Sequence, residues 1–387
     1  MIDEVRKLTH KYYPIIKEIR RELHEIPELG NQEIKTKAYI RKHIDTLSHF
    51  VIEEVLETGL IASIRGIIPG DTIALRADMD GLPINEINEI PYKSKHQGLM
   101  HACGHDAHMA ILLGVAYILN ELYDKIIGEI KLIFQPAEET TGGAKRILET
   151  GSLKNIKAIF GLHVDPSLNI GELLYTSHEM YASSNAFDID IYGDNSHIAN
   201  LHSSVNALEV MTQLLNRLFS LSKKYSKKIL LGFGKIEGGT VRNVLPSCIH
   251  LEGTLRTAKM ELNEEVIRAI FLIIEELKKQ YNTVIKFHEI SYYPLLKNNQ
   301  KFENLFLNTC NEINIKTNKL KDILYTAEDF AWYNYYIPSY FYNIGSGNKM
   351  IKKKLHSNDF MIDEKVLYYG VFLQTMLVLN YNGGSLC

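Results

Sequence analysis

Short apolar runs rich in β-branched residues recur through the first 160 residues, and helical patterns lie between them. The runs cover residues 61–64, 72–75, 130–134 and 156–160, and the helical patterns cover residues 107–122 and 143–150. Strands that alternate with helices are typical of α/β domains. We therefore predict an α/β fold with a central, mostly parallel sheet. A helix over residues 2–26, kinked or interrupted at Pro14, precedes it.

A second pattern interrupts this alternation in the middle of the chain. Strand-like and helical segments follow one another in the order β-α-β-β-α-β over residues 186–192, 206–222, 229–236, 249–256, 263–281 and 284–288. That order is typical of a ferredoxin-like, split βαβ domain of the α+β type. We predict that residues 1–180 and 291–387 form one discontinuous domain and that residues 181–290 form a smaller inserted domain.

Side chains that can bind metal follow three of the predicted strands. Asp78 and Asp80 follow the second run, Glu138 and Glu139 follow the third, and His163 comes at the end of the fourth. The carboxyl ends of parallel strands share one edge of a sheet, where ligand sites form. Carboxylate and imidazole groups gathered at that edge indicate a metal site.

The densest polar cluster is the segment His-Ala-Cys-Gly-His-Asp-Ala-His over residues 101–108. Thiolate, imidazole and carboxylate groups are common ligands of divalent metal ions. The alternative is a polar loop that caps the following helix, with Asp106 as the N-cap residue. A structural zinc finger is disfavoured, because the segment lacks paired Cys-x-x-Cys units. Together with the other strand ends, the cluster favours a catalytic metal site.

Charge and composition narrow the possible partners. The 387 residues include 43 basic and 46 acidic side chains, a formal net charge of -3, so we expect neither nucleic acid nor a membrane as a partner. No apolar run approaches the roughly 18 residues that cross a bilayer, and the charged N-terminal segment does not resemble a secretory signal. Four scattered cysteines do not make a disulfide framework. The expected location is the cytoplasm.

Nine motifs resemble those of one enzyme family. They are RELHEIPELG, RADMDGLP, MHACGHD, FQPAEE, GLHV, GGTVRNVLP, EGTLRT, TAEDFA and LHSNDF. In this order they resemble the aminoacylase and carboxypeptidase type of metallo-amidohydrolases, in the branch with hippurate hydrolase, auxin-conjugate hydrolases and N-acetyldiaminopimelate deacetylase. The resemblance covers residues 20–360. It implies a metallopeptidase-like catalytic domain, an inserted lid and dimerisation domain, and a homodimer.

The resemblance also implies a centre of two divalent metal ions, zinc or manganese, with cobalt or nickel as further possibilities. Their ligands would be Cys103, His105, Glu139, His163 and His356. Asp80 would support the metal loop without binding metal directly. Glu138 would be the general base, which takes a proton from a metal-activated water and delivers it to the leaving amine.

Three residues of the insert are assigned to the substrate by the same resemblance. Asn243 would face the substrate, Arg256 would bind its carboxylate through a guanidinium fork, and His197 would stabilise the oxyanion. A structural role for His197 and a plain surface position for Arg256 are the alternatives. Around His197 the family's Gly-Gly-His-Ala-Ala-x-Pro-His is replaced by Asn-Ser-His-Ile-Ala-Asn-Leu-His. Without two glycines and a proline, this loop can adopt a different conformation.

These assignments favour an enzyme that hydrolyses the amide bond of N-acyl amino acids, for example N-acetyl amino acids, and releases the free amino acid. A dipeptidase or carboxypeptidase of the same family is the first alternative, because peptides are N-acyl amino acids too. A non-catalytic binding protein with the same fold is the second. Loss of the base or of a metal ligand would indicate it, and neither is lost here.

Overall fold

The computed structural model describes residues 1–349, 351 and 353–383, and Cys387 lies outside these ranges. The chain divides into two compact units. The first comprises Met1–His178, Lys297–Lys321 and the chain from Trp332 onward, and the second comprises Glu179–Leu296 and Asp322–Ala331. The insert predicted over residues 181–290 falls within the second unit.

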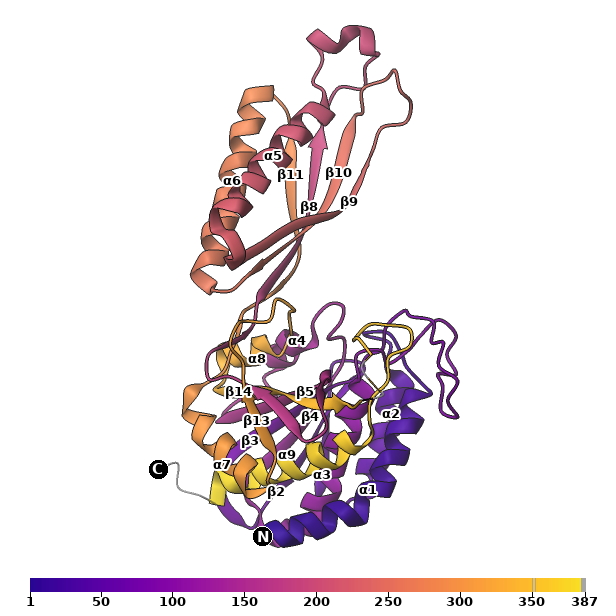
Figure 1. The fold of residues 1–387 in the computed structure, drawn as a ribbon, viewed down its shortest axis with the longest axis vertical. Helices are drawn as coiled ribbons and strands as arrows, with labels where there is room; N and C mark the ends of the chain where they lie inside the picture. Colours follow the sequence, from indigo (N-terminus) through magenta and orange to yellow (C-terminus); the bar gives the residue numbers. More distant parts are fainter. Residues whose placement is uncertain (350, 352, 384–387) are drawn as a thin grey trace. The chain divides into compact units, whose positions relative to one another are not determined.

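An eight-stranded sheet forms the centre of the first unit (Figure 1). Its strands are β1 (Phe50–Val55), β2 (Gly59–Arg65), β3 (Ile68–Asp78), β4 (Ile127–Gln135), β5 (Ala158–Asn169), β6 (Glu172–Tyr175), β13 (Lys316–Lys319) and β14 (Ser339–Gly347). They lie in the order β1-β2-β4-β3-β5-β14-β6-β13. The central strands β4, β3, β5 and β14 are parallel, and β1 and β2 are antiparallel additions at one edge. The predicted fold class is confirmed.

The register of the central strands brings their carboxyl ends level. Asp78 at the end of β3 is paired with Gln135 at the end of β4, and Arg76 of β3 is paired with Gly161 of β5. The polar residues that follow these positions therefore start from one edge of the sheet, where ligand sites form in α/β proteins.

Helices of the first unit pack on this sheet and on one another. They are α1 (Ile2–His24), α2 (Ile34–Ile44), α3 (His105–Glu121), α4 (Gly143–Thr150), α7 (Glu303–Glu312), α8 (Ala331–Tyr336) and α9 (Lys365–Gly383). Helices α3 and α9 contact each other and strands β3 and β4, and α1 packs on both helices. Almost every residue of α3 is buried, as expected for a helix that is apolar on all sides. Helix α1 continues through Pro14.

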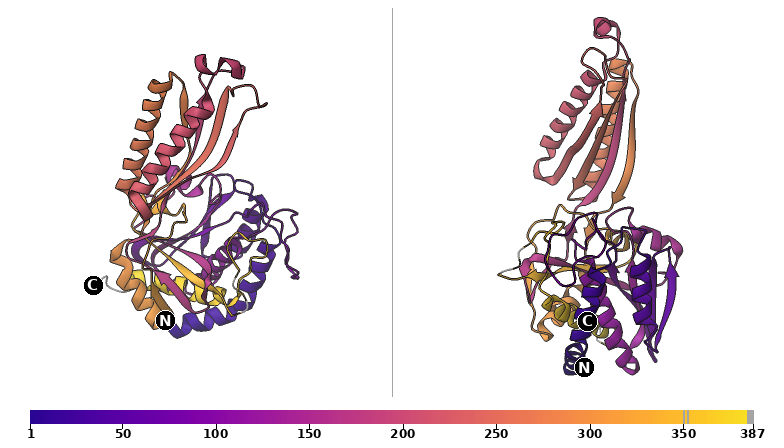
Figure 2. Two further views of the ribbon diagram at one scale, coloured as in Figure 1. Left: turned by 45° about the horizontal axis from the view of Figure 1, so that its top comes forward. Right: turned by 90° about the vertical axis from the view of Figure 1, so that its right-hand side faces the viewer.

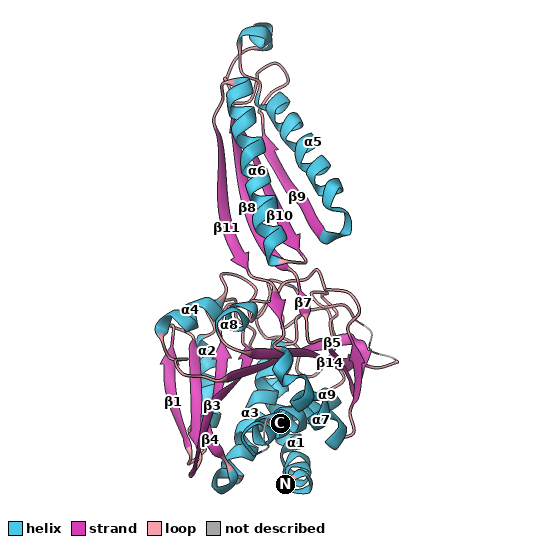
Figure 3. Cartoon of the chain, turned by 90° about the vertical axis from the view of Figure 1, so that its left-hand side faces the viewer, coloured by secondary structure: helices cyan, strands magenta, loops and turns pink. Residues whose placement is uncertain are grey.

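The second unit has the ferredoxin-like order that the sequence predicts. Its elements are β7 (Glu179–Tyr181), β8 (Ser183–Tyr192), α5 (Ala207–Tyr225), β9 (Ile229–Gly238), β10 (Cys248–Thr257), α6 (Met260–Tyr281), β11 (Ile285–Tyr293) and β12 (Leu296–Lys297). Strands β11-β8-β10-β9 form an antiparallel sheet. Figures 2 and 3 show α5 and α6 together on one face of this sheet. Burial alternates along β8, which leaves the other face of the sheet polar.

Four short 3-10 helices complete the fold: η1 (Tyr123–Lys125), η2 (Ile198–Ser203), η3 (Ser226–Lys228) and η4 (Gln300–Phe302). Within the described ranges, the helices are too short or too polar for any of them to span a bilayer.

Candidate metal centre

The metal-binding cluster forms around the loop that leads into α3. Gly104 is the N-cap residue of α3 and has a φ of 91°, a conformation that glycine adopts without strain. A Cβ at this position would lie 2.4 Å from Cγ2 of Val164. Gly104 therefore allows the loop to pass close to β5, so that Cys103 and His105 on either side approach His163 of that strand.

All five residues assigned as metal ligands lie together. Cys103 Sγ is 3.3 Å from His163 Nε2 and 3.3 Å from His356 Nε2, and His356 Nε2 is 3.1 Å from Glu139 Oε1. Two sets of possible ligand atoms, each within 4.8 Å, share the thiol: Cys103, His105 and His163, and Cys103, Glu139 and His356. Two overlapping sets with one common ligand fit a pair of neighbouring cations.

Asp80 positions Glu139 and His105 through hydrogen bonds, although it belongs to neither of the two ligand sets. Its carboxylate accepts a hydrogen bond from the backbone N–H of Glu139 at 2.9 Å, and its backbone oxygen accepts one from Nδ1 of His105 at 2.9 Å. In the neutral ring, which is the form that would bind a cation, donation through Nδ1 leaves Nε2 of His105 with a lone pair directed into the cluster. That buried nitrogen has no hydrogen-bond partner among the described residues. An unpartnered imidazole nitrogen beside a thiol and carboxylates fits a metal ligand.

The electrostatics of the cluster also fit a bound cation. Burial and the nearby carboxylates of Glu139 and Glu138 raise the pKa of the Cys103 thiol well above its usual value. Burial opposes protonation of His105, but Asp78, Asp80 and Glu139 outweigh it and raise the pKa to about 10. The hydrogen bond from His356 to Glu139 raises the pKa of His356. These groups therefore hold protons when no cation is bound, and a divalent cation would replace that positive charge.

Glu138 lies with the cluster but is distinct from the two sets that share the thiol. Its carboxylate, together with His105 and Glu139, forms another group of ligand atoms within 4.8 Å, and its side chain is buried. A buried carboxylate beside a metal position can accept and return a proton in hydrolysis.

Two buried residues at the cluster were not assigned a role by the sequence reasoning. Asp78 accepts hydrogen bonds from His108 Nδ1 at 2.6 Å and from Arg76 at 2.7 Å. Nε2 of His108 accepts the backbone N–H of Val164, the residue after His163, at 2.9 Å. Burial lowers the pKa of His108 to about 4, consistent with a neutral ring. His108 therefore links the end of β3 to the end of β5. In the sequence, the signal for this role was the position of His108 one helical turn after His105.

The alternative in which Asp106 is the N-cap residue of α3 does not hold. The cap residue is Gly104. The Asp106 carboxylate instead lies 2.9 Å from Nε of Arg20 and 2.7 Å from Nδ1 of His24, both on α1. His24 also lies 3.3 Å from Glu86. These buried ion pairs connect the metal loop to the first helix.

The residues assigned to the substrate lie in the second unit. His197 and Asn243 are exposed and belong to adjoining loops, because the backbone oxygen of Asn243 accepts the N–H of Ile198 at 2.9 Å. His197 Nδ1 accepts the N–H of Ala199. Arg256 lies on β10 and is half-buried, and burial lowers its pKa. Its guanidinium forms no ion pair with a described residue.

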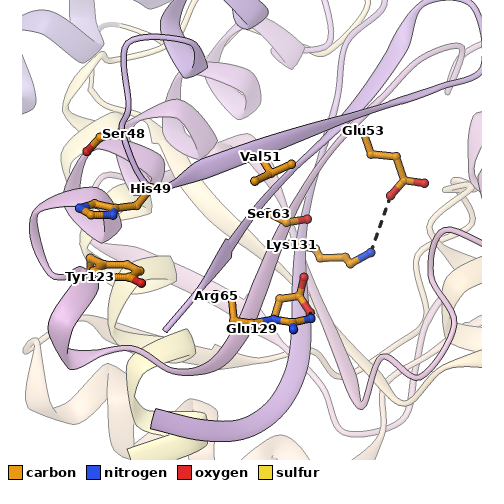
Figure 4. Close-up of a pocket in the computed structure, with 9 residues that line it drawn as sticks. All are labelled: Ser48, His49, Val51, Glu53, Ser63, Arg65, Tyr123, Glu129 and Lys131. Atoms are coloured by element: carbon orange, nitrogen blue, oxygen red, sulfur yellow. Dashed lines mark hydrogen bonds and ion pairs between the residues drawn. The ribbon is translucent and has the colours of Figure 1, made fainter. Parts of the chain in front are cut away.

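An open pocket of about 550 Å³ lies over the opposite end of β4, among residues of β1 and β2 (Figure 4). Its charged side chains pair with one another: Arg65 is 2.9 Å from Glu129, and Lys131 is 3.8 Å from Glu53. None of the residues assigned to the site lines this pocket.

A parallel sheet that presents buried thiol, imidazole and carboxylate ligands at its carboxyl edge defines a metal-dependent hydrolase. Residues 74–380 match Peptidase family M20/M25/M40. The chain belongs to this family, and it is a metal-dependent enzyme that hydrolyses amide bonds.

Three similar proteins illustrate the range of the family. The chain is 36% identical to N-acetyl-L-cysteine deacetylase of Bacillus subtilis (strain 168), over 90% of this chain and 84% of the relative. It is 32% identical to thermostable carboxypeptidase 2 of Saccharolobus solfataricus, over 98% of this chain and 100% of the relative. The structure also matches the crystal structure of the Bacillus subtilis YXEP protein, a dinuclear metal binding peptidase from the M20 family. The TM-score is 0.84 at 31% identity, and the match covers 97% of this chain and 99% of that protein. The family predicted from the motifs is confirmed.

Proposed function

We propose that the enzyme hydrolyses N-acyl amino acids, N-acetyl amino acids among them, and releases the free amino acid. The observation that carries this proposal is the convergence of Glu138 with two overlapping ligand sets at one sheet edge. The similarity to a protein named as an N-acetyl-L-cysteine deacetylase supports the choice of acyl group. The similarity to a carboxypeptidase supports short peptides as the alternative substrates.

Two divalent metal ions would be held by Cys103, His105, Glu139, His163 and His356. Bound there, they would supply Lewis acidity to the amide carbonyl and acidity to a water molecule. The thiolate and imidazole ligands favour zinc, and the carboxylate also admits manganese, cobalt or nickel.

The chain's own side chains perform the proton transfer and orient the substrate in this proposal. Glu138 takes the proton of the attacking water and gives it to the leaving amine. Arg256 binds the substrate carboxylate, which would provide the charge partner that this half-buried guanidinium lacks among the described residues. Asn243 contacts the substrate, and His197 stabilises the oxyanion.

The second unit is proposed as a lid and as the dimerisation unit of a homodimer. Its sheet ends in the strands β9 and β11, and β9 exposes Leu230 and Ile236. An edge strand with apolar side chains is suited to pairing with a second copy. The cytoplasm is the proposed location, which agrees with the free thiols of Cys103, Cys248 and Cys310.

Amine release from a panel of N-acetyl amino acids, N-benzoyl amino acids and dipeptides tests the proposed activity. The metal-reconstituted enzyme should release the amine, and Glu138→Gln should retain its metal and lose at least about 100-fold in kcat. The best substrate separates a deacylase from a peptidase. Equal activity of Glu138→Gln would reject the assigned base. A metal-loaded enzyme that releases no amine from any of these substrates would reject the proposed function.

A further inference from the structure

The turn that carries Glu138 and Glu139 starts from an unusual backbone conformation. Ala137, the residue before them, is buried and has a φ of 59°. Residues other than glycine rarely adopt positive φ values, because Cβ then crowds the backbone. The surrounding structure must therefore hold Ala137 in place.

Glu33 provides the contact that holds it. One carboxylate oxygen of Glu33 accepts the backbone N–H of Ala137 at 2.8 Å, and the other accepts the hydroxyl of Thr58 at 2.7 Å. Glu33 and Thr58 are both buried. The Thr58 hydroxyl fixes the carboxylate, and the carboxylate in turn fixes the Pro136–Ala137 peptide plane.

The segment just before Glu33 packs on the same turn. A Cβ at Gly30 would lie 2.3 Å from Oγ1 of Thr140 and 3.0 Å from Cα of Ala137, so this position requires glycine. Asn31 donates a hydrogen bond to the Thr141 hydroxyl at 3.1 Å. The end of the RELHEIPELG motif therefore lies directly against the turn.

The backbone is thus held on both sides of Glu138. Glu33 accepts the N–H of Ala137, and Asp80 accepts the N–H of Glu139 at 2.9 Å. The second of these contacts belongs to the metal cluster, whereas the first lies outside it. Loss of the first would release the Pro136–Ala137 peptide, whereas the Ala137 carbonyl would still accept the N–H of Gly142 at 3.0 Å and the amide of Glu139 would stay bound to Asp80.

We propose that Glu33 is a positioning residue that aims the Glu138 carboxylate by holding Ala137 in the left-handed conformation. This inference rests on the proposed role of Glu138 as the general base. It gives the segment just after the RELHEIPELG motif a task in the reaction, although Glu33 is not among the assigned metal ligands.

Three substitutions test the proposal through a double-mutant cycle. Glu33→Met removes both acceptor oxygens, and Glu33→Gln retains one. Ala137→Gly makes the left-handed conformation available without strain. We expect Glu33→Met to lower kcat about 10- to 100-fold, the usual cost of a small displacement of a catalytic group. Metal content and KM should stay within about threefold, and Glu33→Gln should retain most of the activity.

The decisive result is the rescue. In the Glu33→Met background, Ala137→Gly should recover at least about half of the logarithmic loss in kcat, because glycine needs no partner to hold this φ. Wild-type kcat in folded, metal-loaded Glu33→Met, or a double variant no better than the single one, would overturn the proposal. If Glu33→Met does not fold, Glu33→Asp, which is one methylene shorter, takes its place in the same cycle.

Glu28, in the neighbouring RELHEIPELG motif, offers a matched control. Its carboxylate accepts the N–H and hydroxyl of Thr36 at 2.9 and 3.0 Å and does not contact the turn. Glu28→Gln should lower the melting temperature but leave kcat unchanged. A loss of kcat equal to that of Glu33→Met would show a general effect of the motif and would overturn the specific role of Glu33.

Hydrogen exchange of residues 135–142 provides a readout that needs no substrate. Exchange in this segment should be faster in Glu33→Met than in the wild type, Glu33→Gln or Glu28→Gln. If the wild-type enzyme hydrolyses none of the panel substrates, the proposed function fails, and this exchange comparison still decides whether Glu33 holds the turn. Unchanged exchange in Glu33→Met would reject it.

Discussion

Two regions of the molecule carry the same kinds of side chain with different consequences. One is the carboxyl edge of the sheet in the first unit. The other is the outer face of the sheet in the second unit, which is the polar face opposite α5 and α6. On the outer face, His250 Nδ1 lies 2.8 Å from one oxygen of Asp190, and His288 Nε2 lies 3.3 Å from the other. Glu252 stands beside His250 at 3.6 Å. The side chains of His250 and His288 are 30% and 48% exposed, whereas His105 in the metal cluster is 1% exposed.

The difference shows that the direction of the side chains, more than composition, makes a metal site. Exposure alone does not separate the two regions, because His356 of the cluster is 51% exposed. Side chains on one face of a sheet point the same way from adjacent strands, so they meet in pairs. Chain segments that leave the ends of parallel strands can turn toward one point. Among the described residues, every group of three or more donor atoms within 4.8 Å includes residues from the carboxyl edge, and none lies on the outer face.

The largest effect is expected from Cys103, which both ligand sets share. Cys103→Ala should weaken binding of both metal ions by more than about 100-fold, because it removes a primary ligand from each. Metal content after dialysis and calorimetric titration measure the loss. Cys310→Ala is the control, since this buried thiol lies on α7, outside the metal cluster. Retention of one tightly bound ion by Cys103→Ala would show that the two sets do not share the thiol.

Arg256 is half-buried and forms no ion pair with a described residue, so its removal should also have a large effect. Arg256→Met should lower kcat/KM by about 100-fold, mainly through KM, as expected for loss of a charged contact to a substrate carboxylate. Steady-state kinetics on an N-acetyl amino acid and on its amide, which lacks the carboxylate, give the measurement. An equal loss on both substrates would contradict carboxylate binding.

Substitution of His108 tests whether a residue that is not an assigned metal ligand affects the metal affinity of the cluster. His108→Leu removes the link between Asp78 and the backbone of Val164, and we expect metal affinity to fall about 10-fold or more. Titration with Co²⁺ should also show a changed absorption spectrum. His43→Leu is a matched control, because His43 bonds Tyr117 on the surface of α3 and lies outside the cluster. Unchanged affinity in His108→Leu would limit the site to its direct ligands.

His250 should show the smallest effect, as an exposed member of a paired cluster. The hydrogen bond to Asp190 raises the pKa of His250. The pair therefore stabilises the fold fully below about pH 6.5, the usual pKa of an unfolded histidine, and this contribution is lost as the pH rises through the folded-state value. His250→Gln should change the free energy of unfolding by less than about 1 kcal/mol and leave metal content unchanged. Tight metal binding at this face would show that side chains on one face of a sheet can also form a metal site.

Much of the fold and of the cluster could be predicted because it depends on local patterns. Apolar runs indicated the strands, and the residues just after them lie at the carboxyl edge because parallel strands share their direction. The N-cap of α3 could not be predicted, because the cap residue is Gly104 and Asp106 lies inside the first turn, where its carboxylate pairs with side chains of α1. The contact between Glu33 and Ala137 joins residues 104 positions apart, and no local pattern indicates it. Contacts of this kind depend on tertiary packing.

The wide sequence spacing of the proposed metal ligands has a consequence for biosynthesis. Cys103 and His356, which meet at 3.3 Å, are separated by 253 residues. At about 5–20 residues per second, a ribosome needs roughly 13–50 s to travel from one codon to the other. The entire second unit is synthesised within that interval, before the last proposed ligand is added. The complete centre can therefore assemble only after His356 has been synthesised, and a chain truncated before His356 cannot form it.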